Sequence, residues 1–303
     1  MKRILAVLVC IGFAAAQAPQ VHGSLAWGFG AHATPGLPPL AEWGLSGHLE
    51  GRYEVGAFSV EAVLDPSFRA LPSGEGQAVL GLREAFLRYR SPRFDVTLGK
   101  LRFPLETGRL LLPFALDEVS AAGVRQGVWA AQVDAFFGAT RLGVALAYRD
   151  AHWVPLLRAQ RSFGSLDLSG NALYVDGRAA VSLGGSGLVG TLVAHGEAWG
   201  FTAPFEGRVL VGLNGFLNEA LWTLEGAWIP CRPQVAGQLL LPLSETDLLA
   251  VDGRALLKAE SEGHLTIQLS RALADGEYAL ALLGGFGPGS PTYGVRVETR
   301  SFF

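Results

Sequence analysis

The sequence predicts an all-β protein, a transmembrane antiparallel up-and-down β-barrel of about 18 strands. From Ser24 to the last residue, apolar side chains recur at every second position with turn residues between the runs, and no helical pattern of comparable length competes. Hydrophobic residues make up 50% of the chain and the mean hydropathy is +0.30. After residue 20, however, no segment offers the ~18 consecutive apolar residues of a membrane-spanning helix. High hydropathy spread over alternating positions is typical of strands with lipid on one side and water on the other.

The first residues have the pattern of a cleaved secretory signal peptide, which we place at residues 1–16. A charged start is followed by an apolar run from Ile4 to Ala16 that ends in small residues suited to cleavage. A membrane anchor is the less favoured alternative, because the run is too short to span a bilayer and Pro19 and Gly23 follow it. Residues 17–303 then form a single barrel domain.

The first half of this domain divides into five strands. Each alternates apolar and polar residues, as between Leu49, Tyr53 and Val55 and the charged positions beside them. A bulge near Gly99 is expected, because both Asp95 and Lys100 must face the polar side. The predicted strands are Ser24 to Thr34, Leu45 to Val55, Phe58 to Leu64, Gln77 to Arg90 and Arg93 to Phe103.

The second half alternates more regularly. In its clearest strand, Trp222, Leu224 and Trp228 oppose Thr223 and Glu225. The predicted strands are Trp129 to Phe137, Leu142 to Tyr148, His152 to Phe163, Ser165 to Val175, Arg178 to Gly187, Val189 to Phe201, Gly207 to Leu217, Ala220 to Ile229, Val235 to Leu243, Leu248 to Ala259, His264 to Leu273, Glu277 to Phe286 and Tyr293 to Phe303.

The strand count depends on one glycine-rich stretch. Residues 178–194 can be divided into one strand or two, so that 16 strands is the alternative to 18. Both numbers are even, as in bacterial single-chain barrels. The longest links, at 35–44, 65–76, 104–126 and 287–292, all follow odd-numbered strands, which is the expected asymmetry between long outer loops and short inner turns.

The last strand places Tyr293, Val295 and Val297 on one face and charged residues on the other, and the chain ends in Phe303. Such a strand resembles the C-terminal sorting signal of bacterial outer-membrane proteins. The resemblance implies localisation in the outer membrane, with its lipid as a partner, and recognition of this strand by the barrel-assembly machinery. Whether several copies assemble into a homo-oligomer stays open.

A second resemblance covers Leu82 to Arg90, the Asp95-Val-Thr-Leu-Gly-Lys100 strand and Asp117. This succession resembles the general and substrate-selective porins of the outer membrane, in which a glutamate-aromatic strand precedes a Leu-Gly-Lys strand and a loop that ends near an aspartate. The tryptophan and glycine that usually follow the basic residue in those families are absent. The resemblance implies a diffusion channel.

The link at 104–126 is too apolar for an ordinary surface loop, since most residues from Leu110 to Leu116 are hydrophobic. Two placements remain open. Inside the barrel, the apolar residues would pack on the wall and Glu106, Arg109, Asp117 and Glu118 would face the pore. Outside it, the segment would touch lipid headgroups or a neighbouring protomer.

Charges that line a narrow place set the selectivity of a pore. The candidates for the pore lining and constriction are Glu84, Arg88, Lys100, Arg102, Glu106, Arg109, Asp117, Glu118, Arg296, Glu298 and Arg300. Basic and acidic lumen residues roughly balance, which predicts weak selectivity. A local excess of Arg88, Lys100, Arg102 and Arg109 over the nearby acids would tilt the pore slightly toward anions.

No constellation of residues indicates an enzyme, a cofactor or a metal site. His195 and Glu197 lie two apart on one strand face, as do His48 and Glu50, but such pairs are expected in a polar lumen. No nucleophile elbow, zinc motif or phosphate loop occurs. The net charge of −3, with both signs scattered, gives no indication of nucleic-acid binding.

Two functions from different classes remain. The first is an outer-membrane porin for passive diffusion of small hydrophilic solutes or ions through a charged, weakly selective lumen. The second is a non-conducting barrel with a structural or adhesive role. A soluble secreted β-sandwich or β-helix is the least favoured alternative, because Trp222, Trp228, Leu265 and Ile267 would form apolar bands on its outside.

Overall fold

The computed structural model describes residues 19–35, 38–70, 76–103, 105, 108–111, 114, 116, 118–119, 125–257, 261–287 and 291–303, with the backbone alone for 118–119. The predicted signal peptide lies outside these residues. Eighteen strands form one antiparallel sheet and two short strands form a second. The large sheet contains β1 (Gln20–Ala33), β2 (Leu40–Val55), β3 (Phe58–Ala70), β4 (Gly76–Arg90), β5 (Phe94–Leu101), β8 (Val128–Phe137), β9 (Thr140–Arg149), β10 (His152–Phe163), β11 (Leu166–Val175), β12 (Arg178–Val189), β13 (Leu192–Phe201), β14 (Glu206–Leu217), β15 (Ala220–Trp228), β16 (Gln234–Pro242), β17 (Asp247–Leu256), β18 (Glu262–Leu273), β19 (Gly276–Phe286) and β20 (Thr292–Phe302). The small one pairs β6 (Glu118–Val119) with β7 (Arg125–Gln126).

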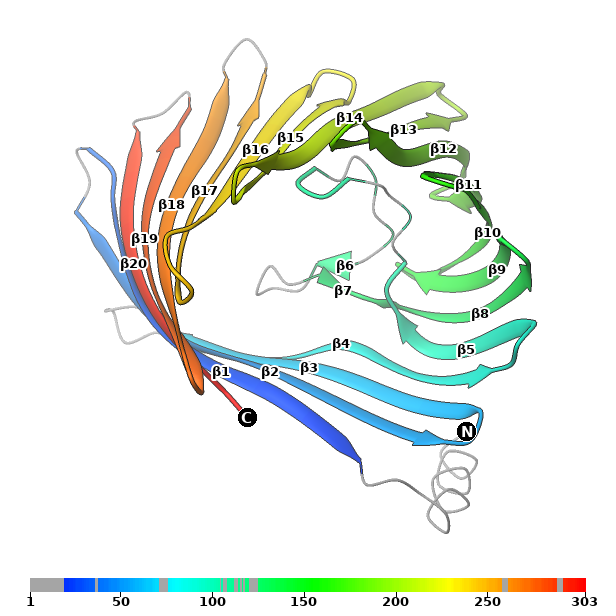
Figure 1. Cartoon of the computed structure of the whole chain (residues 1–303), viewed down its shortest axis with the longest axis horizontal. Helices are drawn as coiled ribbons and strands as arrows, with labels where there is room; N and C mark the ends of the chain where they lie inside the picture. The colour runs from blue at the N-terminus through cyan, green and yellow to red at the C-terminus, as the bar shows by residue number, and fades with distance from the viewer. Residues whose placement is uncertain are drawn as a thin grey trace.

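The large sheet closes on itself. Each strand pairs with its neighbours in the chain, and β1 pairs with β20 from Ser24 opposite Phe302 to Ala33 opposite Tyr293 (Figure 1). Phe303 continues this seam, because its backbone N–H donates to the Gly23 carbonyl at 3.0 Å and its carbonyl accepts from the Gly23 N–H at 2.9 Å. Closure leaves no open sheet edge, which is what a strand protein needs in lipid. The predicted 18-stranded antiparallel barrel is confirmed.

The glycine-rich stretch that made the count ambiguous forms two strands, β12 and β13. The turn between them falls at Gly190, which has a φ of +64°, two residues later than predicted. Neighbouring hairpins use tight turns as well: Asp176 and Gly177 both have positive φ, 52° and 75°, as a type I′ turn requires. Eighteen strands rather than 16 is therefore correct.

The predicted alternation of faces holds in the barrel. Trp27, Trp228 and Tyr293 are 55%, 61% and 58% exposed on the outside, and Tyr148 is exposed as well, while Tyr53 and Trp222 are half-buried. Polar residues such as Asp134, Asn171 and Glu225 are buried on the inner side. An apolar exterior around a polar interior is the arrangement of a barrel that spans a membrane.

Two strands are longer than predicted. β2 begins at Leu40 and β3 continues to Ala70, so the links at 35–44 and 65–76 were overestimated. Pro66 misled the prediction, because proline lacks an N–H for the ladder. In the structure the ladder between β2 and β3 skips Gly47–His48 and Asp65–Pro66, and then resumes at Ser46 opposite Ser67.

The predicted bulge near Gly99 is wrong, although the backbone there is unusual. Gly99 has a φ of +141°, and Lys100, which follows it, is buried on the inner side. No register shift accompanies this residue in the pairings of β5 with β4 and β8. The register shift of this region lies between Val63 and Leu64 of β3, where Arg83 is the additional residue of β4. β5 also ends at Leu101, two residues earlier than predicted.

Candidate functional site: a loop anchored inside the barrel

The described residues of the connection between β5 and β8 lie inside the ring (Figure 1). Two of its leucines, Leu111 and Leu116, are completely buried, with 0% exposure. Leu111 packs with Leu210, Ala227 and Ala236 on the inner faces of β14 to β16. The lumen is therefore the correct one of the two predicted placements, and an outer loop is wrong.

The next part of the loop packs on aromatic residues of β13. The ring of Phe114 lies 4.7 Å from that of Trp199 and 5.6 Å from that of Phe201, measured between centroids. Leu105 and Leu116 belong to the same buried cluster. Apolar residues on the inner side of β13 thus provide the cover that the apolar loop requires.

The strongest polar link between loop and wall is Glu225 of β15, which is 1% exposed. Its carboxylate accepts hydrogen bonds from three consecutive backbone N–H groups of the loop, those of Arg109 at 2.6 Å, Leu110 at 2.8 Å and Leu111 at 2.7 Å. Successive N–H groups that converge on one point form a natural anion site. The wall supplies that anion, so Glu225 fixes the backbone of the loop to β15.

His195 completes this arrangement from two strands away. Its Nε2 lies 2.8 Å from Oε1 of Glu225 and serves as the donor, since a carboxylate can only accept. Gly212 of β14 stands between the two residues in register. A Cβ atom there would lie 2.3 Å from Nε2 of His195 and 2.8 Å from Cγ of Glu225, so only glycine leaves room for the contact.

Arg109 extends from the anchored turn and is exposed to the lumen. With the side-chain amide of Asn214 oriented to satisfy both of its ends, the amide oxygen accepts from the Arg109 guanidinium at 3.2 Å. Gly108 precedes it in a tight turn, where a Cβ atom would lie 2.1 Å from the Leu111 carbonyl oxygen. The turn thus holds the backbone against β15 and directs one cation into the lumen.

Both ends of the loop are tied to the wall as well. The side chain of Asn171 in β11 donates to the Leu105 carbonyl at 3.1 Å. At the other end, the Lys100 ammonium donates to Gln126 at 2.9 Å, and the N–H of residue 127 donates to the Arg83 carbonyl at 2.8 Å. Arg83 is the extra residue of the register shift, so the irregularity in β4 supplies an acceptor for the end of the loop.

The same part of the wall carries a compact ionic group. Asp65 of β3 accepts two hydrogen bonds from the Arg83 guanidinium, at 2.6 and 2.9 Å, and one from Nδ1 of His48 at 2.9 Å. These contacts lie where Pro66 interrupts the ladder between β2 and β3. We interpret this group as a side-chain brace at an irregular place in the barrel.

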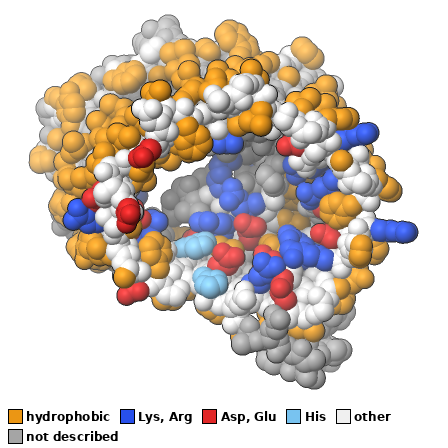
Figure 2. All heavy atoms as spheres, viewed as in Figure 1, with side chains coloured by type: hydrophobic (Ala, Val, Ile, Leu, Met, Phe, Trp, Pro, Cys, Tyr) orange, Lys and Arg blue, Asp and Glu red, His pale blue; other side chains and the backbone are white. Residues whose placement is uncertain are grey.

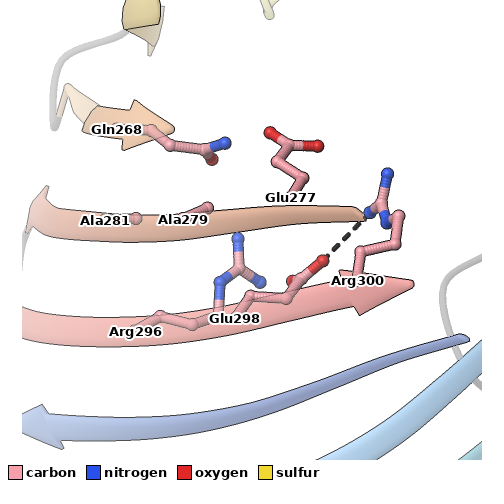
Figure 3. Close-up of a pocket in the computed structure, with 7 residues that line it drawn as sticks. All are labelled: Gln268, Glu277, Ala279, Ala281, Arg296, Glu298 and Arg300. Atoms are coloured by element: carbon pink, nitrogen blue, oxygen red, sulfur yellow. Dashed lines mark hydrogen bonds and ion pairs between the residues drawn. The ribbon is translucent and has the colours of Figure 1, made fainter. Parts of the chain in front are cut away.

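On the far side of the barrel, β20 contributes a row of inward charges. Arg296, Glu298 and Arg300 line a hollow together with Glu277 of β19 (Figure 3). Within the row, Arg300 forms an ion pair with Glu298 at 2.9 Å. Small residues, Gly28 and Gly30 among them, stand opposite the row on β1. This wall is separate from the one that carries the loop (Figure 1).

The predicted constriction residues therefore fall into three places. Glu84, Arg88 and Lys100 lie on adjoining strands β4 and β5, where Arg88 donates to Thr97 at 3.3 Å and lies over the Phe86 ring at 4.8 Å. The second place is the loop, where the exposed Arg102 lies at the start and Arg109 lies against the wall of β14 and β15. The third place is the β20 row. Glu106, Asp117 and the side chain of Glu118 lie outside the described residues.

The sequence did not indicate the residues that hold the loop. Glu225 stood out only as a polar residue opposite Trp222, His195 only as the partner of Glu197, and Asn171 not at all, and Glu225 lies 114 positions from Leu111. No local pattern distinguishes an anchoring carboxylate from Glu50 on another part of the wall. Within the described ranges, no group of His, Cys, Asp and Glu is arranged to hold a metal ion, and no helix is long and apolar enough to cross a membrane.

The comparisons with known proteins give matches in structure but not in sequence. No family model and no curated protein matches the sequence. Solved structures do match: OpdQ of Pseudomonas aeruginosa has a TM-score of 0.70 at 8% identity, covering 95% of this chain and 99% of its own. The chain has a porin fold.

Two further structures of the Opd and Occ outer-membrane porins agree with this result. OccK2 (OpdF) of P. aeruginosa has a TM-score of 0.67 at 10% identity, covering 94% of this chain and 98% of its own. OccAB2 of Acinetobacter baumannii has a TM-score of 0.67 at 7% identity, with the same coverage. The resemblance to porins inferred from Leu82 to Lys100 is thus confirmed for the fold.

Proposed function

We propose that the protein is a porin of the bacterial outer membrane, a channel rather than an enzyme, through which small hydrophilic solutes or ions diffuse passively. The observation that carries this proposal is the anchored loop. It is held against one side of the lumen by Glu225 and by the packing of Leu111, and an opening bordered by charged side chains lies beside it (Figure 2).

The alternative is a non-conducting barrel with a structural or adhesive role. Such a barrel needs no open lumen, and filling it would exclude water more simply than a loop drawn to one wall. The inner faces of β18 to β20 instead carry charged and polar side chains next to small ones, such as Ala279 and Ala281. A wet, partly narrowed lumen favours the channel.

Weak selectivity with a slight preference for anions is the finer part of the proposal. Both signs of charge line the lumen, and strong selectivity needs a ring of one sign. Arg102 and Arg109 are exposed near the loop. Lys100 is buried and bonded to Gln126, and Arg88 is half-buried and donates to Thr97, so these two charges contribute less to the pore. The preference therefore rests on the two arginines more than on the four basic residues expected from the sequence.

The remaining assignments follow from a role in the outer membrane. The N-terminal 16 residues would direct export, the Phe303 strand would be recognised by the barrel-assembly machinery, and lipid would cover the exposed aromatic residues. OccK2 (OpdF) has been solved in complex with glucuronate. A small carboxylate such as glucuronate is therefore a suitable first solute for this channel.

The test is ion conduction by the purified, folded protein in a planar bilayer. We expect stable single-channel conductance and, under a salt gradient, a small reversal potential of the sign that indicates anion preference. The absence of conductance from a folded barrel would favour the structural alternative. A strong cation preference would leave a channel but refute the role given to Arg102 and Arg109.

A further inference from the structure

We infer that the hollow formed by β18, β19 and β20 is a binding subsite for a small zwitterion whose ammonium and carboxylate groups are several bonds apart. The hollow has a volume of ≈ 170 Å³ and is lined by Gln268, Glu277, Ala279, Ala281, Arg296, Glu298 and Arg300. Pockets for drug-sized ligands are about 300–1,000 Å³, so this one suits a smaller molecule. The biological use of the subsite rests on the proposed channel function, since a solute reaches it from the lumen.

The hollow exists because small residues surround the charged row. Ala279 and Ala281 of β19 stand opposite Glu298 and Arg296, and Gly28 and Gly30 of β1 stand opposite the same two residues on the other side. Larger side chains at these positions would fill the space above the sheet. The charged side chains therefore project into free volume on the inner surface (Figure 3).

Two of the four charges neutralise each other and two do not. Arg300 pairs with Glu298 at 2.9 Å. In the part of the chain that the structure describes, no ion pair or side-chain hydrogen bond is found for Arg296 or Glu277. The site thus offers one free cation and one free anion, with the amide of Gln268 beside them as a donor and an acceptor.

The two free charges lie at opposite ends of the hollow. Glu277 is paired in register with Arg300, and Arg296 with Ala281, four residues further along β19. Four residues of strand correspond to about 13 Å between the backbones of Glu277 and Arg296, and both side chains extend into the space between. A molecule with charges roughly 7 Å apart, the length of a dipeptide, contacts both.

This arrangement discriminates between charge types. A simple anion attracted by Arg296 meets the carboxylates of Glu298 and Glu277, and a simple cation attracted by Glu277 meets two guanidinium groups. A zwitterion satisfies both ends at once, with a charge-assisted hydrogen bond at each. The subsite is therefore expected to prefer glycylglycine over its singly charged analogues.

The experiment compares three probes of similar size: glycylglycine, N-acetylglycylglycine, which is an anion, and glycylglycine amide, which is a cation. We expect glycylglycine to interrupt the single-channel current at concentrations about tenfold lower than either analogue, because each analogue loses one charged hydrogen bond. Isothermal titration of the folded protein in detergent gives the same comparison without depending on conduction. Failure to conduct thus counts against the channel proposal alone.

Four variants assign the effect to the hollow. Arg296→Gln and Glu277→Gln should each weaken glycylglycine binding about tenfold. Ala281→Leu should weaken it as much without changing any charge, because the leucine fills the space. The control is Arg52→Gln, which removes the same kind of charged group at a different place, on β2, where Arg52 pairs with Glu54 and Glu61.

The inference is overturned by any of three results. These are equal affinity for glycylglycine and N-acetylglycylglycine, equal weakening by Arg52→Gln and Arg296→Gln, and the absence of glycylglycine binding to the folded wild-type protein. Binding that prefers glycylglycine and is lost in all three hollow variants but kept in Arg52→Gln establishes the subsite.

Discussion

A single side chain, Glu225, fixes three consecutive backbone N–H groups of the loop to the barrel wall. A buried carboxylate is costly unless its oxygens accept hydrogen bonds. Here three loop N–H groups and His195 supply four, at 2.6 to 2.8 Å. The same N–H groups would themselves be unsatisfied against an apolar wall. Loop and wall therefore satisfy each other's hydrogen bonds. If they separated, the Glu225 carboxylate and three backbone N–H groups of the loop would lose their partners.

Glu225→Gln tests this anchor at the level of one atom. The amide keeps the size of the side chain but turns one acceptor into a donor that faces backbone N–H groups. We expect the docked position of the loop to be less stable by about 3 kcal/mol. The mean single-channel conductance should then rise, while the barrel still folds. Glu50→Gln, the same change on β2, is the control and should leave conductance unchanged. Equal conductance of Glu225→Gln and the wild type would show that Glu225 does not hold the loop.

Gly212→Ala tests the room between His195 and Glu225. The added methyl group would stand 2.3 Å from the His195 ring and displace it from the carboxylate. We expect the free energy of unfolding to fall by about 1–3 kcal/mol, the usual cost of overpacking. Urea unfolding in detergent measures this change. Gly226→Ala is the matched control, because a Cβ atom there meets nothing within 4 Å. Equal stability of the two variants would contradict the packing argument.

At the scale of strands, the alternation of apolar and polar residues predicted the number of strands and most of their positions. His152 to Phe163 was correct at both ends, and even the glycine-rich β12 and β13 were separated. Errors occurred where a residue type breaks the pattern without ending the strand. Pro66 interrupts one ladder of β3 yet leaves the strand continuous, and the register shift opposite Arg83 produces no change in composition.

The last strand offers a direct test of orientation. Val297 is 42% exposed on the outer face, whereas Glu298 faces the lumen and pairs with Arg300. Val297→Lys should cost roughly 2–4 kcal/mol if residue 297 lies near the bilayer midplane. Glu298→Lys should cost under about 1 kcal/mol, the typical value of an accessible ion pair. Unfolding of both variants in lipid vesicles measures the difference, and equal losses would rule out the assigned faces.

For the whole molecule, the sequence predicted that the loop needs cover but not what covers it. The apolar run from Leu110 to Leu116 signalled burial, and both lumen and exterior satisfied that signal. The choice depends on partners distant in sequence: Glu225, Leu210 and Trp199 come together with the loop only when the barrel closes. The predicted basic cluster likewise divides in space, since Arg88 and Arg109 lie on different walls.

The central claim is that the lumen is an open passage narrowed by an anchored loop. The most direct measurement is single-channel conductance of the wild type beside a variant in which a short glycine-serine link replaces Leu110 to Leu116. The account predicts that both proteins fold and conduct, and that the variant conducts more, because the segment packed on β13 to β16 has been removed. Equal conductance in the two folded proteins, or none in either, would contradict it.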